Sequence, residues 1–275
     1  KEDSRMKVYI SADLEGISGI THWDETGKEG GEDYQRARRL MTLEVNAAVE
    51  GAVEAGATEV VVNDSHGHMR NLLIEELHPT ARLISGSPKP FSMVQGLDGG
   101  FACAFFIGYH ARAGSRGVLS HTYTGTVAEY RVNGRVVGET GMNAAVAGEY
   151  GVPVVLVSGD STVVEEARGL LGPVETVAVK EYVARNAAVS LPPEKVHALL
   201  REAARRAVAR APQIPPFRVE PPVEIQIRFT HSGLADAAEL MPGALRIDDV
   251  TVGYRAPDFL TAYRAGRALM ALAAR

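Results

Sequence analysis

The residues best suited to chemistry in this sequence are two carboxylates near its start, Asp13 and Glu15. They follow a short apolar run at residues 8–10 and precede Gly16. This pattern predicts a β-strand that ends in a glycine turn, and residues two apart on a strand point the same way. Two carboxylates held so close repel each other unless a cation lies between them. The pair therefore predicts a cation site, provided that other parts of the chain supply further ligands.

Three later segments also end in residues that bind metal ions. The apolar strand predicted at residues 59–63 leads to His66, and the apolar run 101–107 leads to His110. An Asn-Gly turn predicts a hairpin that delivers Glu139 to the start of a helix. In open α/β sheets, such side chains meet at the carboxyl ends of the strands. Two histidines and three carboxylates exceed the needs of one catalytic zinc and favour two zinc ions that share a carboxylate and a water.

Simpler interpretations of these residues stay open. A histidine after a strand is more often an ordinary loop residue than a ligand, and an acidic pair is often solvated or caps a helix. His68 and Asp64 are rival ligands close to His66, although Asp64 also suits a turn. His121 is a further polar group on the loop after His110. The metal hypothesis therefore depends on the repetition of the pattern rather than on any one residue.

The elements that must position these residues alternate between strands and helices. We predict an α/β fold, a mostly parallel sheet covered by helices on both faces, with a smaller C-terminal α+β domain. After a strand at residues 152–157, two further β/α units are expected before residue 191. A polar loop at residues 21–31, which holds the only tryptophan, is long enough to cover a site.

The domain boundary is predicted near a proline-rich segment at residues 212–216 and the helix before it. We expect a metal-binding catalytic α/β domain over residues 6–190. A smaller α+β domain over residues 191–275 is expected to have a role in substrate binding or oligomer formation. Residues 1–5 are charged and are expected to be a disordered or added start.

Composition and motifs argue against several classes of protein. The 275 residues are 45% hydrophobic and 23% charged, which is ordinary for a globular protein, and a net charge of −5 without a basic block gives no sign of nucleic-acid binding. Cys103 is the single cysteine and lies in an apolar run, so it predicts a core residue. No apolar run approaches the roughly 18 residues that span a bilayer, and no signal peptide is visible, so we expect no membrane association and a cytoplasmic location. The sequence has no G-x-S-x-G, Walker A, G-x-G-x-x-G or H-E-x-x-H motif.

Several blocks of the sequence resemble the DppA-type zinc D-aminopeptidases, a family of self-compartmentalising binuclear metallopeptidases. The resemblance runs from Met6 to the last predicted helix. Its blocks, in matching order, are residues 11–19 (SADLEGISG), 62–66 (VNDSH), 83–86 (LISG), 89–94 (KPFSMV), 108–113 (GYHARA), 120–121 (SH), 138–139 (GE) and 142–144 (MNA).

The resemblance implies two zinc ions in each chain, with Asp13 bridging both. Glu15 and His110 would complete one zinc site. His66 and Glu139 would complete the other. Manganese or cobalt are possible alternatives, because sites of histidine and carboxylate also accept them.

The same resemblance implies that His121 is catalytic, as a general acid or as the group that stabilises the oxyanion. The expected reaction is removal of the N-terminal residue, a D-residue such as D-alanine, from short peptides by a hydroxide that bridges the metals. Asn143 is a candidate for binding substrate, although helix capping or hydrogen bonding in the core fits equally well. The implied assembly is a homo-oligomer, a decamer of two stacked pentameric rings.

Two other functions stay open from the sequence. A related two-metal amidohydrolase could act on L-peptides or on another amide, because no motif reports the shape of the substrate pocket. A non-catalytic peptide-binding component of a transport system is an alternative of another class. Such a protein would carry no stoichiometric zinc and would hydrolyse nothing.

Overall fold

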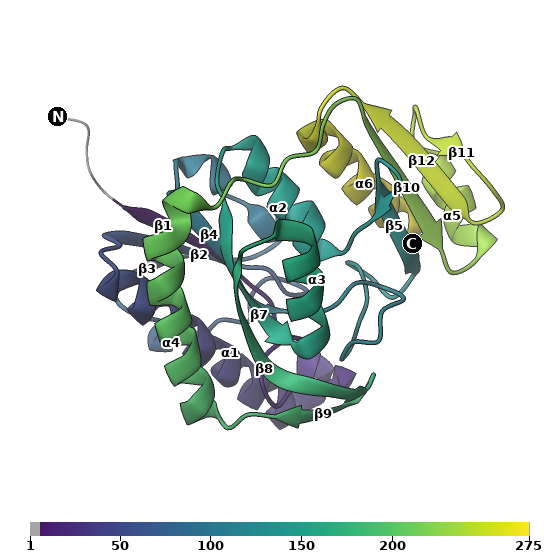
Figure 1. Ribbon diagram of the computed structural model, residues 1–275. Coiled ribbons are helices and arrows are strands. Elements are labelled where there is room, and N and C mark those ends of the chain that lie inside the picture. Colours follow the sequence, from purple (N-terminus) through teal and green to yellow (C-terminus); the bar gives the residue numbers. More distant parts are fainter. Residues whose placement is uncertain (1–5, 275) are drawn as a thin grey trace.

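A seven-stranded sheet forms the larger part of the computed structural model, which describes residues 6–274 (Figure 1). The predicted start at residues 1–5 therefore lies outside the described residues. The strand order is β3-β2-β1-β4-β7-β8-β9, and all neighbours are parallel except β8 and β9. The strands are β1 (Lys7–Ala12), β2 (Glu59–Asp64), β3 (Ala81–Ile84), β4 (Cys103–Tyr109), β7 (Val154–Asp160), β8 (Glu175–Ala184) and β9 (Ala187–Ser190).

Helices cover both faces of this sheet, as predicted. All seven residues of β4 are buried, which is expected of a central parallel strand with apolar neighbours on either side. Alternate side chains of the strands enter two separate hydrophobic clusters: Ile10 and Phe105 join the cluster formed with α1 (Gly31–Glu54) and α4 (Pro193–Arg210). Tyr9 and Phe106 join the cluster formed with α2 (Glu139–Glu149) and α3 (Ser161–Leu171).

A second, antiparallel sheet has the order β11-β12-β10-β5-β6 and lies at the upper right of Figure 1. The helix α5 (Ser232–Glu239) and the last helix, α6 (Phe259–Ala273), pack with it, and α6 also contacts α2 of the larger part. Its strands are β5 (Val127–Val132), β6 (Arg135–Val136), β10 (Val223–Phe229), β11 (Leu245–Arg246) and β12 (Thr251–Ala256).

The two sheets do not divide the chain at residue 191. The hairpin β5–β6 lies within residues 6–190, yet β5 pairs with β10 in the second sheet. Conversely, α4 lies beyond residue 191, yet it packs on α1 against the first sheet. Local composition cannot show such an exchange of elements, because the partners are far apart in sequence. Separate folding units on either side of residue 191 stay a prediction.

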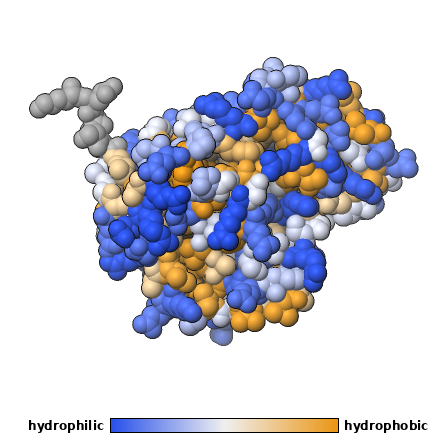
Figure 2. Space-filling view, in the orientation of Figure 1, coloured by the Kyte–Doolittle hydropathy of each residue, from blue (hydrophilic) through white to orange (hydrophobic). Residues whose placement is uncertain are grey.

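The end of the larger sheet differs from the prediction of two β/α units after β7. One such unit forms, α3 followed by β8, and then β9 returns as an antiparallel edge strand. Only Arg185 and Asn186 connect β8 to β9, and this is too short for the crossover that a parallel strand needs. These two strands carry the exposed side chains of Val183 and Val189. The label of β9 lies at the bottom of Figure 1, and hydrophobic residues gather in the lower part of Figure 2, which has the same orientation.

Within residues 6–274, no helix combines the length and the apolar character that crossing a membrane requires.

Candidate metal centre

The five predicted ligands meet at the carboxyl end of the larger sheet. Asp13 and Glu15 directly follow β1, His66 follows β2, and His110 follows β4. These three strands are neighbours, with β1 in the middle, so their ends deliver the side chains to one place. Glu139 is the first residue of α2 and completes the group. All five residues are at least 92% buried.

Two glycines let the backbone after β1 approach the end of β4. The amide of Gly16 donates a hydrogen bond of 2.8 Å to the carbonyl of Gly108. A β-carbon on Gly16 would collide with the carbonyl of Tyr109, and Gly108 has a φ of +70°, a conformation that favours glycine. The predicted glycine turn thus holds the carboxylates of Asp13 and Glu15 against the strand that carries His110.

Asp13 occupies the centre of the group, because its two oxygens face different histidines. Its Oδ1 lies 3.3 Å from Nδ1 of His66, and its Oδ2 lies 3.4 Å from Nε2 of His110. A carboxylate with one oxygen toward each half of the site has the position that a bridging ligand needs. This geometry agrees with the bridging role that the resemblance implies for Asp13.

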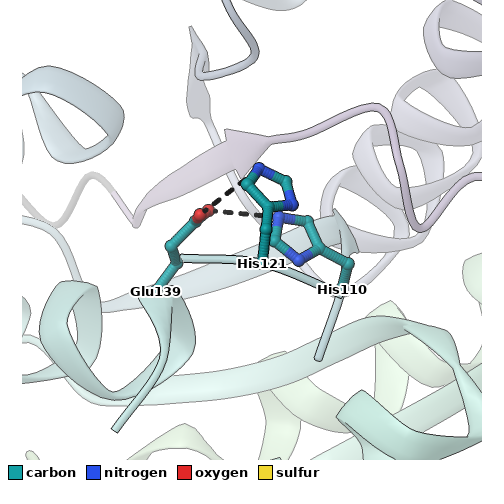
Figure 3. A group of neighbouring side chains, drawn as sticks. All are labelled: His110, His121 and Glu139. Carbon is teal, nitrogen blue, oxygen red and sulfur yellow. Dashed lines mark ion pairs between the residues drawn. The ribbon is translucent and has the colours of Figure 1, made fainter. Parts of the chain in front are cut away.

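The other ligand atoms form two sets around Asp13. Glu15 Oε2 lies 2.9 Å from Nδ1 of His66, and Glu139 Oε2 lies 3.4 Å from Nε2 of His110. Figure 3 shows the second set, in which the Glu139 carboxylate faces the stacked rings of His110 and His121. By nearest neighbours, Glu15 accompanies His66 and Glu139 accompanies His110. The resemblance implies the opposite pairing, so the distribution of these ligands between two ions stays a prediction.

Each of the three histidines is fixed by a backbone carbonyl on one ring nitrogen. A carbonyl can only accept, so that nitrogen carries a proton, and in the neutral ring the other nitrogen presents its lone pair. The other nitrogen of each ring faces carboxylate oxygens, so a proton or a metal ion must lie between them, and metal-binding histidines are commonly oriented this way. The accepting carbonyls are those of Thr26 for His66 Nε2 (2.6 Å), Ala111 for His110 Nδ1 (3.0 Å) and Leu119 for His121 Nδ1 (2.9 Å).

Buried atoms without partners also show that these residues fit a metal ion. Among the described residues, neither Oδ2 of Asp13 nor Nε2 of His110 has a hydrogen-bond partner. Burial and the charge of Glu15 raise the pKa of Asp13 to about 7. Burial opposes a charge on His66, but Glu15 and Asp13 beside it hold its pKa well above the usual value. The cluster thus needs positive charge, and its nitrogen and oxygen donors suit zinc, manganese or cobalt.

His121 lies at the edge of this group and lines the cavity above it. Its Nε2 is 3.9 Å from the nearest oxygens of both Glu15 and Glu139, farther than the closest contacts of His66 and His110. The side chain of His121 is 13% exposed, against 1% for His110, and its ring packs edge-on against Trp23. Burial and the adjacent His110 lower the pKa of His121. A histidine in this place can meet a substrate while it remains beside the ligands.

The cavity has a volume of about 310 Å³ and opens directly over the carboxylates. Trp23 and Thr26 form part of its wall, in the short 3-10 turn Trp23–Thr26, and a second turn, Lys28–Gly30, follows. The predicted loop at residues 21–31 therefore does border the site. This volume is at the small end of the range for ligand pockets, so it suits a small substrate.

Asn143 does not line this cavity, and its predicted role in binding substrate stays a prediction. It is fully buried, and its Nδ2 donates a hydrogen bond of 2.9 Å to the hydroxyl of Tyr109. Its Oδ1 accepts hydrogen bonds from the hydroxyls of Tyr123, at 3.1 Å, and Tyr263, at 3.4 Å. Asn143 is thus placed to hold tyrosines behind the cavity wall, the core hydrogen-bonding interpretation of this residue.

Two buried charged residues that the sequence did not single out hold the loop after β1. Lys180 of β8 donates hydrogen bonds to the carbonyls of Glu15, at 2.5 Å, and Ile17, at 2.9 Å, and a third bond to Ile20 at 2.6 Å. Burial lowers the pKa of Lys180 to about 8. Glu44 of α1 accepts a hydrogen bond of 2.8 Å from the amide of Ser18. A lone lysine in a strand gives no local sign that it is buried, because only the tertiary packing decides that.

Comparison with known proteins identifies the family of this chain. The family model described as D-aminopeptidase matches residues 6–268. A D-aminopeptidase from Bacillus subtilis (strain 168) is 44% identical over 272 residues, which are 98% of this chain and 98% of the relative. The solved structure of the Zn-dependent D-aminopeptidase DppA from Bacillus subtilis, described as a self-compartmentalizing protease, matches with a TM-score of 0.95 and 44% identity over 98% of each chain. Since the family model covers nearly the whole chain, this protein belongs to the D-aminopeptidase family.

Proposed function

We propose that this protein is a two-zinc aminopeptidase that removes the N-terminal residue from short peptides, preferentially a D-residue such as D-alanine. The observation that carries the proposal is the buried group of ligands around Asp13, which opens into a small cavity. The zinc dependence of the similar Bacillus subtilis enzyme supports the choice of metal and of reaction.

Five residues would hold the two ions: Asp13, Glu15, His66, His110 and Glu139. When bound, two zinc ions supply an acidified water as the nucleophile and polarise the scissile carbonyl. The protein contributes a rigid arrangement of donors, because each histidine is oriented by a backbone carbonyl and Asp13 is fixed between two of them.

His121 would move the proton in this reaction. Its Nδ1 donates to the carbonyl of Leu119, so Nε2 is the nitrogen that exchanges a proton with the substrate. Protonated at Nε2, it would either stabilise the oxyanion of the tetrahedral intermediate or protonate the leaving amine. Its position in the cavity wall, beside the predicted ligands, suits both roles.

We also propose that the chain forms a homo-oligomer, a decamer of two stacked pentameric rings, and that it acts in the cytoplasm. The solved structure of the similar Bacillus subtilis enzyme is described as self-compartmentalizing, and this supports an assembly. A cavity of about 310 Å³ would in any case admit a short peptide and exclude a folded protein.

A panel of small substrates tests the proposed reaction. Zinc-loaded protein is given D-Ala-D-Ala, L-Ala-L-Ala and a non-peptide amide, with a chelated sample as the control. We expect hydrolysis of the D-dipeptide above all, with loss of activity on chelation. A clear preference for the L-dipeptide or the non-peptide amide would support the alternative amidohydrolase. Binding of peptides with no zinc and no hydrolysis would support the transport component.

A further inference from the structure

Arg267 brings a positive charge from α6 into the cavity over the metal ligands. Among the described residues that line this cavity it is the one lysine or arginine, while Asp13, Glu15 and Glu139 line it as well. The residue is half-buried, and within residues 6–274 no carboxylate forms an ion pair with its guanidinium. The free cation is therefore available to a negatively charged group in the cavity.

Tyr123 links Arg267 to the metal ligands. The guanidinium of Arg267 lies over the ring of Tyr123, 4.5 Å from its centre, and the amide of Tyr123 donates a hydrogen bond of 2.5 Å to Glu139 Oε1. The hydroxyl of Tyr123 is 2.7 Å from that of Tyr263, which lies one turn before Arg267 in α6. Tyr123 has a φ of +60°, a costly conformation for a bulky residue that persists where the surroundings enforce it. One rigidly held residue thus separates Arg267 from Glu139.

Arg267 and the carboxylates of the predicted metal site line one small cavity, so a short peptide bound there can meet both. An extended chain advances by about 3.3–3.6 Å for each residue. When the first carbonyl of a dipeptide lies at the metal ligands, its C-terminal carboxylate lies about one residue farther along. A guanidinium presents a planar fork of donors that matches a carboxylate, and stacking on an aromatic ring holds that fork in place.

We propose that Arg267 binds the C-terminal carboxylate of the substrate and so selects peptides of about two residues. This inference depends on the proposed function for the identity of the substrate. In a longer peptide, the carboxylate would fall beyond Arg267, and a neutral peptide bond would face the cation instead. In a peptide amide, the negative charge would be missing altogether.

Paired substrates test this role directly. Zinc-loaded wild type and Arg267→Met are compared on D-Ala-D-Ala and on D-alanyl-D-alaninamide, which differ only in the terminal carboxylate. The amide cannot form the charged hydrogen-bonded pair with Arg267, so we expect wild type to prefer the free acid by roughly 10–100-fold in kcat/KM. Arg267→Met cannot form the pair with either substrate, so its preference should fall to about one. Hydrolysis of the amide should change little. Arg264→Met, on the exposed side of the same helix, is the matched control and should keep the preference.

A second variant and a binding measurement make the outcome decisive. Arg267→Lys keeps the charge but loses the fork, so its preference for the acid should be intermediate. Calorimetry measures the affinities of the acid and the amide for the zinc-loaded wild type and each variant where the ligand is not cleaved. A wild type that binds the acid more tightly, but cleaves neither ligand, would refute the aminopeptidase and retain the carboxylate site. Equal affinities and rates for acid and amide in wild type, or the same preference in Arg267→Met, would overturn the inference.

Discussion

Replacing the buried Glu44 with glutamine should remove a loss of folding stability that occurs as the pH rises. Glu44 lies in α1 and is 2% exposed. Its Oε1 accepts the hydrogen bond from Ser18, but its Oε2 has no partner among the described residues. Burial raises the pKa of Glu44 from 4.5 to about 7.

The sign of the effect follows from this raised pKa. The folded protein binds the proton of Glu44 more tightly than the unfolded chain does, so the contribution of this proton to folding stability is full at low pH. It is lost as the pH rises from about 4.5 to about 7, and nothing further is lost above that range. With these two pKa values, Glu44 should lower the free energy of unfolding by about 2 kcal/mol between about pH 5 and about pH 7.5. Glu44→Gln has no proton to lose and should not show this decline.

Urea unfolding of the zinc-loaded proteins at both pH values, at one protein concentration, measures the difference. The quantity of interest is the change in stability with pH for wild type minus that for Glu44→Gln. Effects of pH on the metal ligands occur in both proteins and cancel. Glu32→Gln, on an exposed position of the same helix, is the control and should behave as wild type. Equal pH dependence in wild type and Glu44→Gln would refute this account of the buried carboxyl.

Three further substitutions separate the roles in the site. His121→Ala should lower kcat by about 100-fold or more while the zinc content stays unchanged, as measured by steady-state kinetics and metal analysis; undiminished activity would exclude the proton transfer proposed for it. His66→Ala removes a ligand and should lower the zinc bound per chain, with full retention arguing against the assigned set. Asn143→Ala breaks hydrogen bonds to buried tyrosines and should cost about 1–3 kcal/mol in urea unfolding. Because Asn143 does not line the cavity, the KM of Asn143→Ala should change little, and a large rise in KM with unchanged stability would support the substrate-binding role.

The convergence of the five proposed metal ligands could be predicted because each follows a strong local signal. Asp13, His66 and His110 come after apolar runs, and parallel strands in one sheet must end at the same edge. Glu139 follows an Asn-Gly turn, which specifies a hairpin and hence the start of the next helix. The sequence thus predicts both the identity of these residues and the edge on which they meet.

The rest of the site depends on tertiary packing that local patterns do not contain. Arg267 reaches the cavity because α6 packs beside α2, and this follows from the pairing of β5 with β10 in the second sheet. Asn143 lies four residues after Glu139, on the same side of the helix and one turn deeper. Tyr123 covers that turn, so the side chain of Asn143 meets tyrosine hydroxyls and not the cavity. The spacing of Glu139 and Asn143 predicts that they share a face of the helix, but it does not predict how deeply each side chain is buried.

Zinc titration of the chelated protein, with D-Ala-D-Ala hydrolysis followed at each step, tests the two-metal site most directly. Metal content per chain is measured by mass spectrometry on the same samples. Bound zinc should reach two ions per chain, and hydrolysis should reach its plateau at that stoichiometry. Full hydrolysis by protein without metal, or zinc binding that stops below two ions per chain, would contradict the assignment of Asp13 as the bridge between two metal ions.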